Sequence, residues 1–432
     1  MKSPSACRRL FLAIGVACAL EVRGHAADAA AAALASIRAA DAGRHVATLA
    51  DDAFEGREGG SRGGRAAAAY IVEQLESLGL EPVGDGGSFY QSFGSMRNVL
   101  ALLPGSDPEL SRELIVVGGH YDHVGYGNSR NSFGPFGFVH NGADDNASGV
   151  AGLLEIAEAF VRLPSRPRRS ILFAFWDGEE KGLLGSSHFL RQRPALLAGR
   201  PIVFTVNLDM IGRLRGGRVE AYGTRSSPGM RATVVEANND PANAAALELA
   251  FVWDLEDDSD HYPFIMAGIP TLMLHTGLHD QYHRPSDDVH LVNLDGIEPV
   301  ARLTFGLVAS LADDPAPGPT FRTACRQESD ATRRALEAPA AEPPGPRGRW
   351  GIGTRPDDAG PHPVVVRISI GGPAARAGML PGDRIVAIDG ERIGDQAAML
   401  DRFRMAGPTC SVEIERKGLL RRLELSESPP AP

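Results

Sequence analysis

The chain has 432 residues, of which 43% are hydrophobic and 23% charged. This length predicts two or three domains, and the composition excludes a globally disordered chain. The net charge of −10, from 54 acidic and 44 basic side chains, supplies no broad positive field for phosphates, so a nucleic-acid-binding protein is not expected.

Residues 1–29 are predicted to be a signal peptide. Two arginines precede the apolar run Leu10–Leu20, which is too short to cross a bilayer, and small residues follow it. Cleavage after Ala26 or Ala29 would leave a chain with no transmembrane span. We therefore expect an exported protein, periplasmic or secreted; an uncleaved membrane anchor is the alternative.

Cleavage at either position would leave two cysteines, Cys325 and Cys410. Two cysteines cannot staple a small disulfide scaffold, so the fold must depend on its core or on metal. In an oxidising compartment the two could form one disulfide, and two unpaired thiols are equally compatible with the sequence.

Between residues 45 and 312 the hydrophobic pattern alternates between helix and strand. Buried strands of this continuous apolar type, separated by helices, predict an α/β fold with a mostly parallel twisted sheet covered by helices on both faces. Helical periodicity is found at 61–78, 150–163, 183–193 and 294–311, and continuous apolar runs of strand length at 114–119, 170–176, 202–208 and 271–274.

Polar residues capable of chemistry gather next to these elements. Open α/β sheets place their ligand crevice at the carboxyl ends of the strands, so we expect these residues to share one crevice. They are His120, Tyr121, Asp122 and His123 after the first run, Asp144, Asp145 and Asn146 before the helix at 150, Asp177, Glu179 and Glu180 after the second run, Asn207 and Asp209 at the third, and His275, His279 and His283 at and beyond the fourth.

Imidazole and carboxylate groups without cysteine form a good ligand set for Zn²⁺ and an acceptable one for Mn²⁺ or Co²⁺. Five protein ligands are too many for one tetrahedral zinc, but they suit two zincs that share a bridging carboxylate. In the pair Glu179-Glu180, one carboxylate can bind metal while its neighbour acts as general base. Asp122, two residues after His120, can orient that imidazole.

Five strings in this region, GGHYDHVG (118–125), NGADDNASG (141–149), FWDGEEKGLLGS (175–186), NLDMIG (207–212) and DQYHRPSDD (280–288), occur in one order. Together they closely resemble the M28 family of co-catalytic zinc peptidases, over about residues 45–312. The resemblance implies an α/β fold, two zinc ions and, most often, aminopeptidase activity, and it defines a domain at 30–312.

The resemblance also implies a role for each matching residue. Asp145 matches the carboxylate that bridges the two zincs, and the Asp145–Asn146 peptide is a candidate cis bond. Glu179 matches the general base. Tyr282 stands where some members have a tyrosine that hydrogen-bonds the developing oxyanion. The remaining implied ligands are His120 and Asp209 on one zinc and Glu180 and His283 on the other.

Other polar residues have less specific interpretations. We expect hydrogen-bonded or solvated loop histidines at His123, His140, His275 and His279. We expect a solvated face or a helix N-cap at 257–261, with a third metal site as the alternative. Core packing and a pocket lining are equally compatible with Met210 and Phe264.

The C-terminal part has its own organisation. Residues 313–348 are rich in proline and alanine and are predicted to be a semi-rigid linker. Residues 349–428 read as short strands with two helical pieces, and the string GGPAARAGMLPGDRIVAIDG (371–390) resembles a PDZ domain of the bacterial protease-associated type.

In the PDZ family a glycine-containing loop binds the terminal carboxylate of a peptide through backbone N–H groups. Gly351, Ile352 and Gly353 form the matching loop, so a C-terminal peptide is the implied partner of this domain. A structural or docking appendage is the alternative.

The combined prediction is an exported zinc-dependent aminopeptidase that hydrolyses the N-terminal bond of peptides or proteins. A site rich in carboxylates suits a terminal amine, and Arg284 is the only nearby candidate for binding a terminal carboxylate. The alternatives are a carboxypeptidase, a glutaminyl cyclase, or a catalytically silent peptide-binding protein.

Overall fold

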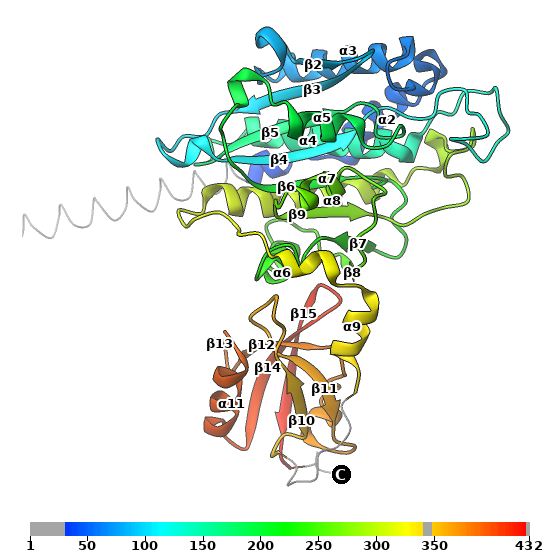
Figure 1. Cartoon of the computed structure of the whole chain (residues 1–432). Coiled ribbons are helices and arrows are strands. Elements are labelled where there is room, and N and C mark those ends of the chain that lie inside the picture. Colours follow the sequence, from blue (N-terminus) through cyan, green and yellow to red (C-terminus); the bar gives the residue numbers. More distant parts are fainter. Residues whose placement is uncertain (1–30, 340–347, 429–432) are drawn as a thin grey trace, which may run out of the picture.

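The structure, a computed structural model, describes residues 31–339 and 348–428. The predicted signal peptide at 1–29 therefore lies outside the described residues, as does part of the predicted linker. Figure 1 shows a larger α/β domain above a smaller β-rich domain, which are connected by the yellow segment.

A nine-stranded mixed sheet forms the centre of the larger domain. Its four central strands run parallel to one another and are flanked by antiparallel neighbours, which confirms the predicted mostly parallel α/β architecture. The spatial order is β1 (Glu81–Pro82), β3 (Met96–Leu103), β5 (Ser170–Trp176), β4 (Leu114–His120), β6 (Ile202–Leu208), β9 (Thr271–His275), β7 (Arg218–Tyr222) and β8 (Glu248–Val252), and β2 (Tyr90–Phe93) pairs with β3.

Two hydrophobic cores lie on opposite faces of this sheet, as the predicted double covering requires. Ile115 and Val117 of β4 belong to one core, and Leu114 and Val116 belong to the other. Successive side chains of a strand point to opposite faces, so a strand covered on both sides is apolar at every position. The sequence LIVV therefore marks β4 as a central strand.

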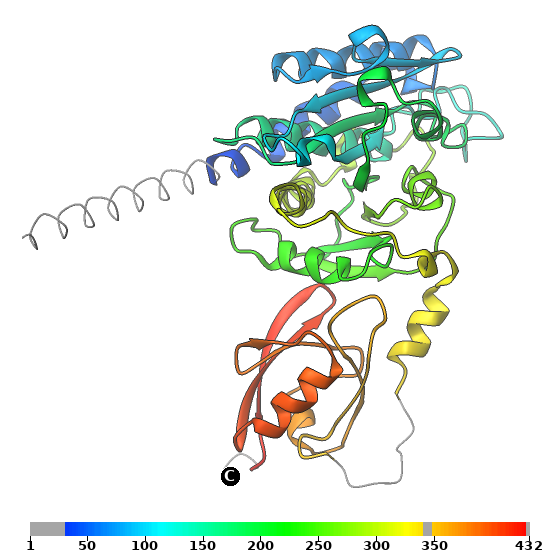
Figure 2. The same ribbon diagram turned by 60° about the vertical axis from the view of Figure 1, so that its left-hand side comes forward.

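Helices cover both faces (Figures 1 and 2). The helices that pack on the larger core are α2 (Ala39–Leu49), α3 (Arg62–Ser77), α4 (Gly149–Val161), α6 (Met230–Asn239) and α8 (Leu294–Asp313). The other face carries α5 (Leu184–Arg191) and α7 (His261–Met266). Short helical turns of this domain are η1 (Asp52–Arg57), η2 (Asp85–Gly87), η3 (Leu110–Arg112), η4 (Ala143–Ser148), η5 (Ala195–Leu197) and η6 (Val289–Leu291).

The segment predicted as a linker is partly structured. It starts at the end of α8 and contains η7 (Thr323–Gln327) and α9 (Asp330–Glu337). Glu328 accepts paired hydrogen bonds from Arg225 of the larger domain and from Arg322. The proline-rich composition concealed this because its prolines lie on either side of the two helices.

The smaller domain is built on a six-stranded antiparallel sheet. Its core gathers Trp350, Val365, Ile385, Phe403 and Ile414. The strand order is β10 (Ile352–Arg355), β11 (Val364–Ile368), β12 (Arg384–Ile388), β14 (Thr409–Arg416) and β15 (Leu419–Ser426), with β13 (Glu391–Arg392) beside β12, and the helices are α10 (Pro373–Arg376) and α11 (Gln396–Met405).

The turn between β14 and β15 contacts the last strand of the larger sheet. The backbone N–H of Leu249, in β8, donates to the carbonyl of Lys417 at 2.8 Å. The side-chain amides of Asn238 and Asn239 donate to the carbonyl of Gly418 at 2.9 and 2.7 Å. Because a free edge strand is a template for unwanted pairing, this turn also protects β8.

Buried ion pairs join the two domains near this turn. Arg231 of α6 donates to both carboxylate oxygens of Glu415 at 3.0 Å, and Glu415 is 2% exposed. Arg384 lies 3.9 Å from the same carboxylate. Burial raises the pKa of Glu415, but the two guanidinium groups outweigh this effect and hold the pKa below its usual value.

Cys325 and Cys410 are both free and buried, one before α9 and the other in β14. Of the two open alternatives, the structure therefore has unpaired thiols. Within residues 31–339 and 348–428, the helices are all too short or too polar to cross a membrane.

We expect Glu415→Gln to lower the free energy of unfolding by about 3–5 kcal/mol, because it removes the negative charge that Arg231 faces at the buried interface. Urea denaturation of the full chain measures this. The matched control is Glu424→Gln, whose side chain is 68% exposed beside Arg422, and which should change stability by less than about 0.5 kcal/mol. Equal effects of the two changes would contradict a stabilising interface.

Candidate active site

The carboxyl ends of β4, β5, β6 and β9 bring the predicted site residues together. Each of two groups has its candidate ligand atoms within 4.8 Å of one another. The first group is His123, Asp145, Glu180 and His283, and the second is His120, Glu179 and Asp209. The two groups therefore contain all five predicted metal ligands and the predicted base, together with His123.

Asp145 stands between the two groups. Its Oδ1 lies 3.4 Å from Nε2 of His120, and its Oδ2 lies 3.1 Å from Nε2 of His283. The residue comes from η4, directly before α4, and is 3% exposed. The peptide bond between Asp145 and Asn146 is cis. One carboxylate thus faces both groups with different oxygens.

In the second group, His120 and Asp209 approach each other at 3.3 Å between Nε2 and Oδ1. Nδ1 of His120 donates to the backbone carbonyl of Asp122 at 3.1 Å, so Nε2 is the ring nitrogen left to bind a metal. The other oxygen of Asp209 accepts a 2.6 Å hydrogen bond from Ser259, and Ser259 accepts one from Asn207. Both ligand candidates are therefore held by hydrogen bonds at the atoms that do not face each other, Nδ1 of His120 and Oδ2 of Asp209.

Asp122 orients two residues of the site. Its carbonyl holds His120, as described, and its Oδ1 accepts a hydrogen bond from the backbone N–H of Glu179 at 3.1 Å. Burial raises the pKa of Glu179 well above its ordinary value; His120 opposes this shift and Glu180 adds to it. Glu179 is thus a carboxylate with an increased affinity for a proton.

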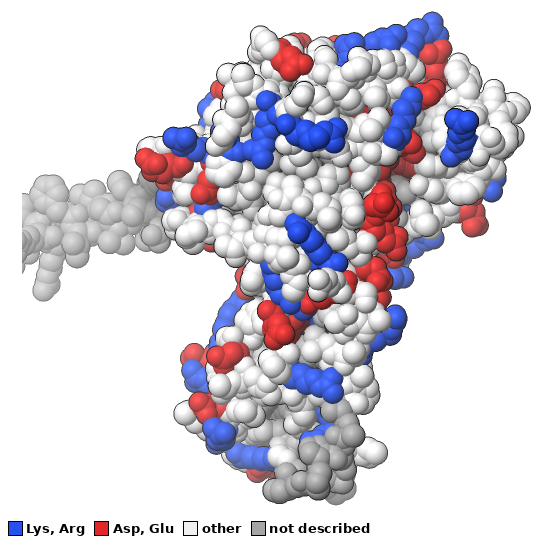
Figure 3. Space-filling model, in the orientation of Figure 1, with Lys and Arg blue, Asp and Glu red and all other residues white. Residues whose placement is uncertain are grey.

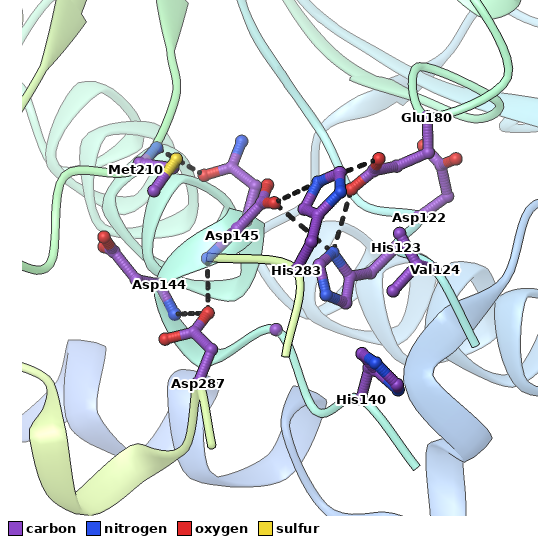
Figure 4. A network of polar contacts seen from close by, with 12 residues as sticks. Asp122, His123, Val124, His140, Asp144, Asp145, Glu180, Met210, His283 and Asp287 are labelled. Atoms are coloured by element: carbon purple, nitrogen blue, oxygen red, sulfur yellow. Dashed lines mark hydrogen bonds and ion pairs between the residues drawn. The ribbon is translucent and has the colours of Figure 1, made fainter. Parts of the chain in front are cut away.

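In the first group, Glu180 divides its oxygens between two histidines. Oε2 lies 3.1 Å from Nε2 of His283, and Oε1 lies 2.9 Å from Nδ1 of His123 (Figure 4). His123 is hydrogen-bonded, as one of the two expectations for it allowed, but it is not solvated: it is fully buried within the site, against a candidate metal ligand. Its position three residues beyond His120, at the same strand end, was the available signal.

The donor set fits zinc. Two atoms bound to one tetrahedral zinc at ~2.0–2.1 Å lie about 3.3 Å apart. The separations of His120 and His283 from their carboxylates are 3.1–3.4 Å. Oδ2 of Asp145 and Nε2 of His283 are buried without a hydrogen-bond partner. A bound cation would stabilise this arrangement, because it would offset the charge of neighbouring carboxylates and give these unpaired atoms a partner.

Two charged residues that the sequence analysis did not single out hold the loops of the site. Arg57 is fully buried and donates to the carbonyls of Leu49, Tyr121, Asn141 and Gly142 at 2.7–2.9 Å. It therefore ties the segment after β4 to the loop that precedes Asp145. Burial lowers the pKa of its guanidinium to about 10, so it stays charged near neutral pH.

Asp287 links the bridging residue to the loop of His283. Its Oδ2 accepts from the backbone N–H groups of Asp144 and Asp145 at 3.0 and 3.1 Å (Figure 4). Its Oδ1 accepts from Arg213 at 3.1 Å. Because Asp287 follows His283 by only four residues, it fixes the position of two candidate ligands relative to each other.

Tyr282 lies beside the first group. Its ring stacks on the ring of His283 with centroids 3.9 Å apart, and Phe133 packs against both at 6.2 and 6.4 Å. Burial raises the pKa of the Tyr282 phenol, and the negative charge of Asp145 raises it further. The hydroxyl therefore remains protonated and available as a donor near neutral pH.

The remaining candidates lie at the margin of the site or in the core. His140 contacts Ser132 and Phe138, and His275 accepts from Gly277, as expected for loop histidines. The side chain of His279 is buried 3.2 Å from Asp144. Of the two expectations for 257–261, a solvated face is wrong for the buried Ser259 and Asp260, whereas Asp260 does stand at the N-cap position of α7. Met210 is buried beside Asn146, and Phe264 packs in the smaller core.

The smaller domain contains a second candidate site. A groove of about 390 Å³ lies between β10 and α11. The predicted loop lies at its end, with Gly351 at a positive φ of 71° and Ile352 and Gly353 at the start of β10. The apolar lining is Trp350, Ile352, Met399, Leu400 and Phe403.

Comparisons with known proteins agree with these two units. Residues 98–308 match the family model "Peptidase family M28", and residues 364–416 match the family model "PDZ domain". Leupeptin-inactivating enzyme 1 of Streptomyces exfoliatus is 29% identical, over 54% of this chain and 47% of its own length. Leucine aminopeptidase 1 of Trichophyton rubrum is 26% identical, over 58% of this chain and 68% of its own length. The chain thus spans about half the length of the former.

Solved structures show the same fold. The LapA aminopeptidase of Legionella pneumophila superposes with a TM-score of 0.54 at 18% identity, over 66% of this chain and 74% of its own. BSAP, a zinc aminopeptidase from Bacillus subtilis, superposes with a TM-score of 0.51 at 16% identity, over 66% of this chain and 98% of its own.

We expect zinc to raise the melting temperature of the metal-stripped chain. Free zinc at a thousand times the dissociation constant adds about 4 kcal/mol, or roughly 10 °C for a domain of this size. Differential scanning calorimetry measures the shift. Asp145→Asn should reduce it, because that carboxylate faces both groups, whereas Asp280→Asn, an exposed carboxylate nearby, should not. An unchanged melting temperature on adding zinc would contradict a metal site.

Proposed function

The chain carries a peptidase family M28 domain and a PDZ domain, and we propose that it is an exported zinc-dependent aminopeptidase. The observation that carries the proposal is the bridging position of Asp145, whose two oxygens face His120 and His283. Such a carboxylate is what two neighbouring zinc ions require. The proposed substrates are peptides or proteins with a free N-terminus.

Two zinc ions would be held by the two groups. His120 and Asp209 would hold one, Glu180 and His283 the other, and Asp145 would serve both. When bound, zinc polarises a substrate carbonyl and makes water more acidic. The remaining steps are carried out by the side chains of this chain.

Glu179 is the proposed general base. Its carboxylate belongs to the group with His120 and Asp209, and Asp122 holds its backbone. The pKa raised by burial lets Glu179 take a proton from the attacking water and return it to the leaving amine. Tyr282, stacked on His283, is the proposed donor to the developing oxyanion.

Recognition of an N-terminus is supported by charge. Asp145, Glu179, Glu180 and Asp209 offer carboxylate oxygens to a terminal amine. Arg284, the candidate for a carboxylate clamp that the sequence offered, donates through Nη1 to the carbonyls of Phe133 and Gly134 at 2.8 and 3.2 Å. A clamp on a terminal carboxylate would have to use the other N–H groups of this guanidinium.

The groove of the smaller domain is the proposed site for the C-terminal segment of a peptide. β10 is the edge strand of its sheet, so a bound peptide can pair with it as an additional strand. The apolar lining beside α11 would take side chains of that peptide. The interface hydrogen bonds described above come from the β14–β15 turn and from Glu415 of β14, whereas the groove is lined by residues of β10 and α11.

Glu179→Ala should retain bound metal but lose about 10²–10⁴-fold in kcat, because a general base is removed without loss of a ligand. Glu180→Ala should instead lose metal. Metal content by mass spectrometry and turnover of leucine anilide distinguish the two effects. The roles are reversed if Glu179→Ala loses zinc and Glu180→Ala keeps it.

Acetylation of a peptide's N-terminus should abolish its hydrolysis, because it removes the positive charge that the carboxylates would bind. Amidation of the C-terminus should leave kcat/KM nearly unchanged. Product analysis by chromatography compares the free, acetylated and amidated forms of one peptide. Loss of turnover on amidation alone would identify a carboxypeptidase.

A further inference from the structure

His123 is the one residue of the site without a role in the proposed function. It follows β4, its backbone N–H donates to the carbonyl of Arg57 at 3.3 Å, and its side chain is fully buried. The chain leaves little space beside it: Gly142 has a φ of 54°, and a Cβ there would lie 2.6 Å from the ring. The ring is therefore fixed in place.

The fixed ring directs Nδ1 at two carboxylates. Nδ1 lies 2.9 Å from Oε1 of Glu180 and 3.5 Å from Oδ2 of Asp145 (Figure 4). Oε1 is not the oxygen that faces His283, because that histidine lies 3.1 Å from Oε2. Glu180 is thus held from two sides, with a different histidine on each oxygen.

The distances favour a hydrogen bond over direct metal binding by His123. A separation of 2.9 Å is typical of an N–H···O hydrogen bond, and it is shorter than the about 3.3 Å expected between two ligands of one tetrahedral zinc. A histidine that binds metal usually donates its second ring N–H, but Nε2 of His123 has no partner. With the proton on Nδ1, only an acceptor lone pair of Nε2 is left unsatisfied.

We propose that His123 is a positioning residue, which donates from Nδ1 to Oε1 of Glu180 and so keeps Oε2 directed at Nε2 of His283. This inference rests on the proposed function, since it assumes that Glu180 binds a metal. Without the donor, the Glu180 carboxylate would be free to rotate and would lose the preorganisation on which ligand strength depends.

Two variants of the full-length protein test the proposal. His123→Asn places an amide N–H near the position of Nδ1 but is a poor zinc ligand, whereas His123→Ala removes the donor. Metal-stripped protein is titrated with Zn²⁺ against a competing chelator, and the Co²⁺ form is examined by visible absorption. His45→Ala, which removes a histidine paired with Tyr70 away from the site, is the control.

We expect His123→Ala to weaken one zinc-binding step about 10–100-fold, as for loss of a group that orients a ligand. His123→Asn should stay within about threefold of the wild type and keep its Co²⁺ spectrum. Equal losses in both variants, or a changed Co²⁺ spectrum in His123→Asn, would overturn the proposal in favour of a direct ligand. Unchanged affinity in His123→Ala would overturn any role for the ring.

The readouts separate this inference from the proposed function. Metal affinity and the Co²⁺ spectrum are measured without substrate, so they remain decisive if the protein hydrolyses no peptide. If His123→Ala fails to fold, the affinity and spectrum of His123→Asn decide the question, because a metal-binding ring could not be replaced by an amide. A wild-type chain that binds no zinc would overturn both proposals.

Discussion

Negative charge is concentrated at one edge of the sheet, and the residues around it are arranged to compensate that charge. Asp145, Glu179, Glu180 and Asp209 converge within a largely buried crevice. Carboxylates so close together repel one another and lose their hydration, so the arrangement is stable only with compensating groups. Histidine side chains supply part of this compensation, and the ligand atoms of each group lie close enough together to hold a cation that supplies the rest.

The surrounding scaffold converts that charge into a defined geometry. Parallel strands end at the same edge, which brings together loops that are far apart in the sequence. Arg57 joins the segment after β4 to the loop that precedes Asp145 through backbone carbonyls, and Asp287 joins the segment of Asp144 and Asp145 to the loop of His283 through backbone N–H groups. Neither residue needs to contact a substrate. Each fixes, through hydrogen bonds, the relative positions of separate loops that carry ligand candidates.

The smaller domain is fastened to the larger one by the same kinds of interaction. Its β14–β15 turn bonds to the backbone of the edge strand β8, and Glu415 accepts from Arg231 across a buried boundary. Breaking such a pair on one side leaves a charge without a partner, so the two domains are energetically coupled. The groove beside β10 therefore has a fixed orientation relative to the active-site domain.

The fold class could be predicted from the sequence, because four continuous apolar runs of strand length alternate with helical periods, which is the pattern of a parallel sheet covered on both faces. The sequence also located helices α3, α4, α5 and α8 to within about two residues, since each has a clear helical period. It did not find the short strands β7 and β8: β7 alternates apolar and polar residues, and the apolar run at 249–253, which contains most of β8, was not predicted as a strand. The metal-binding candidates followed from ordered motifs next to strand ends.

Only the tertiary structure decided how these candidates meet. It placed Asp145 between the two groups and brought His123 against Glu180, 57 residues away in the chain. It also showed that Ser259 and Asp287 support ligand candidates, and that α9 lies within the predicted linker. Such contacts join residues on loops that are far apart in the sequence. Local periodicity carries no information about the distances between these loops, because those distances are set by the order of the strands in the folded sheet.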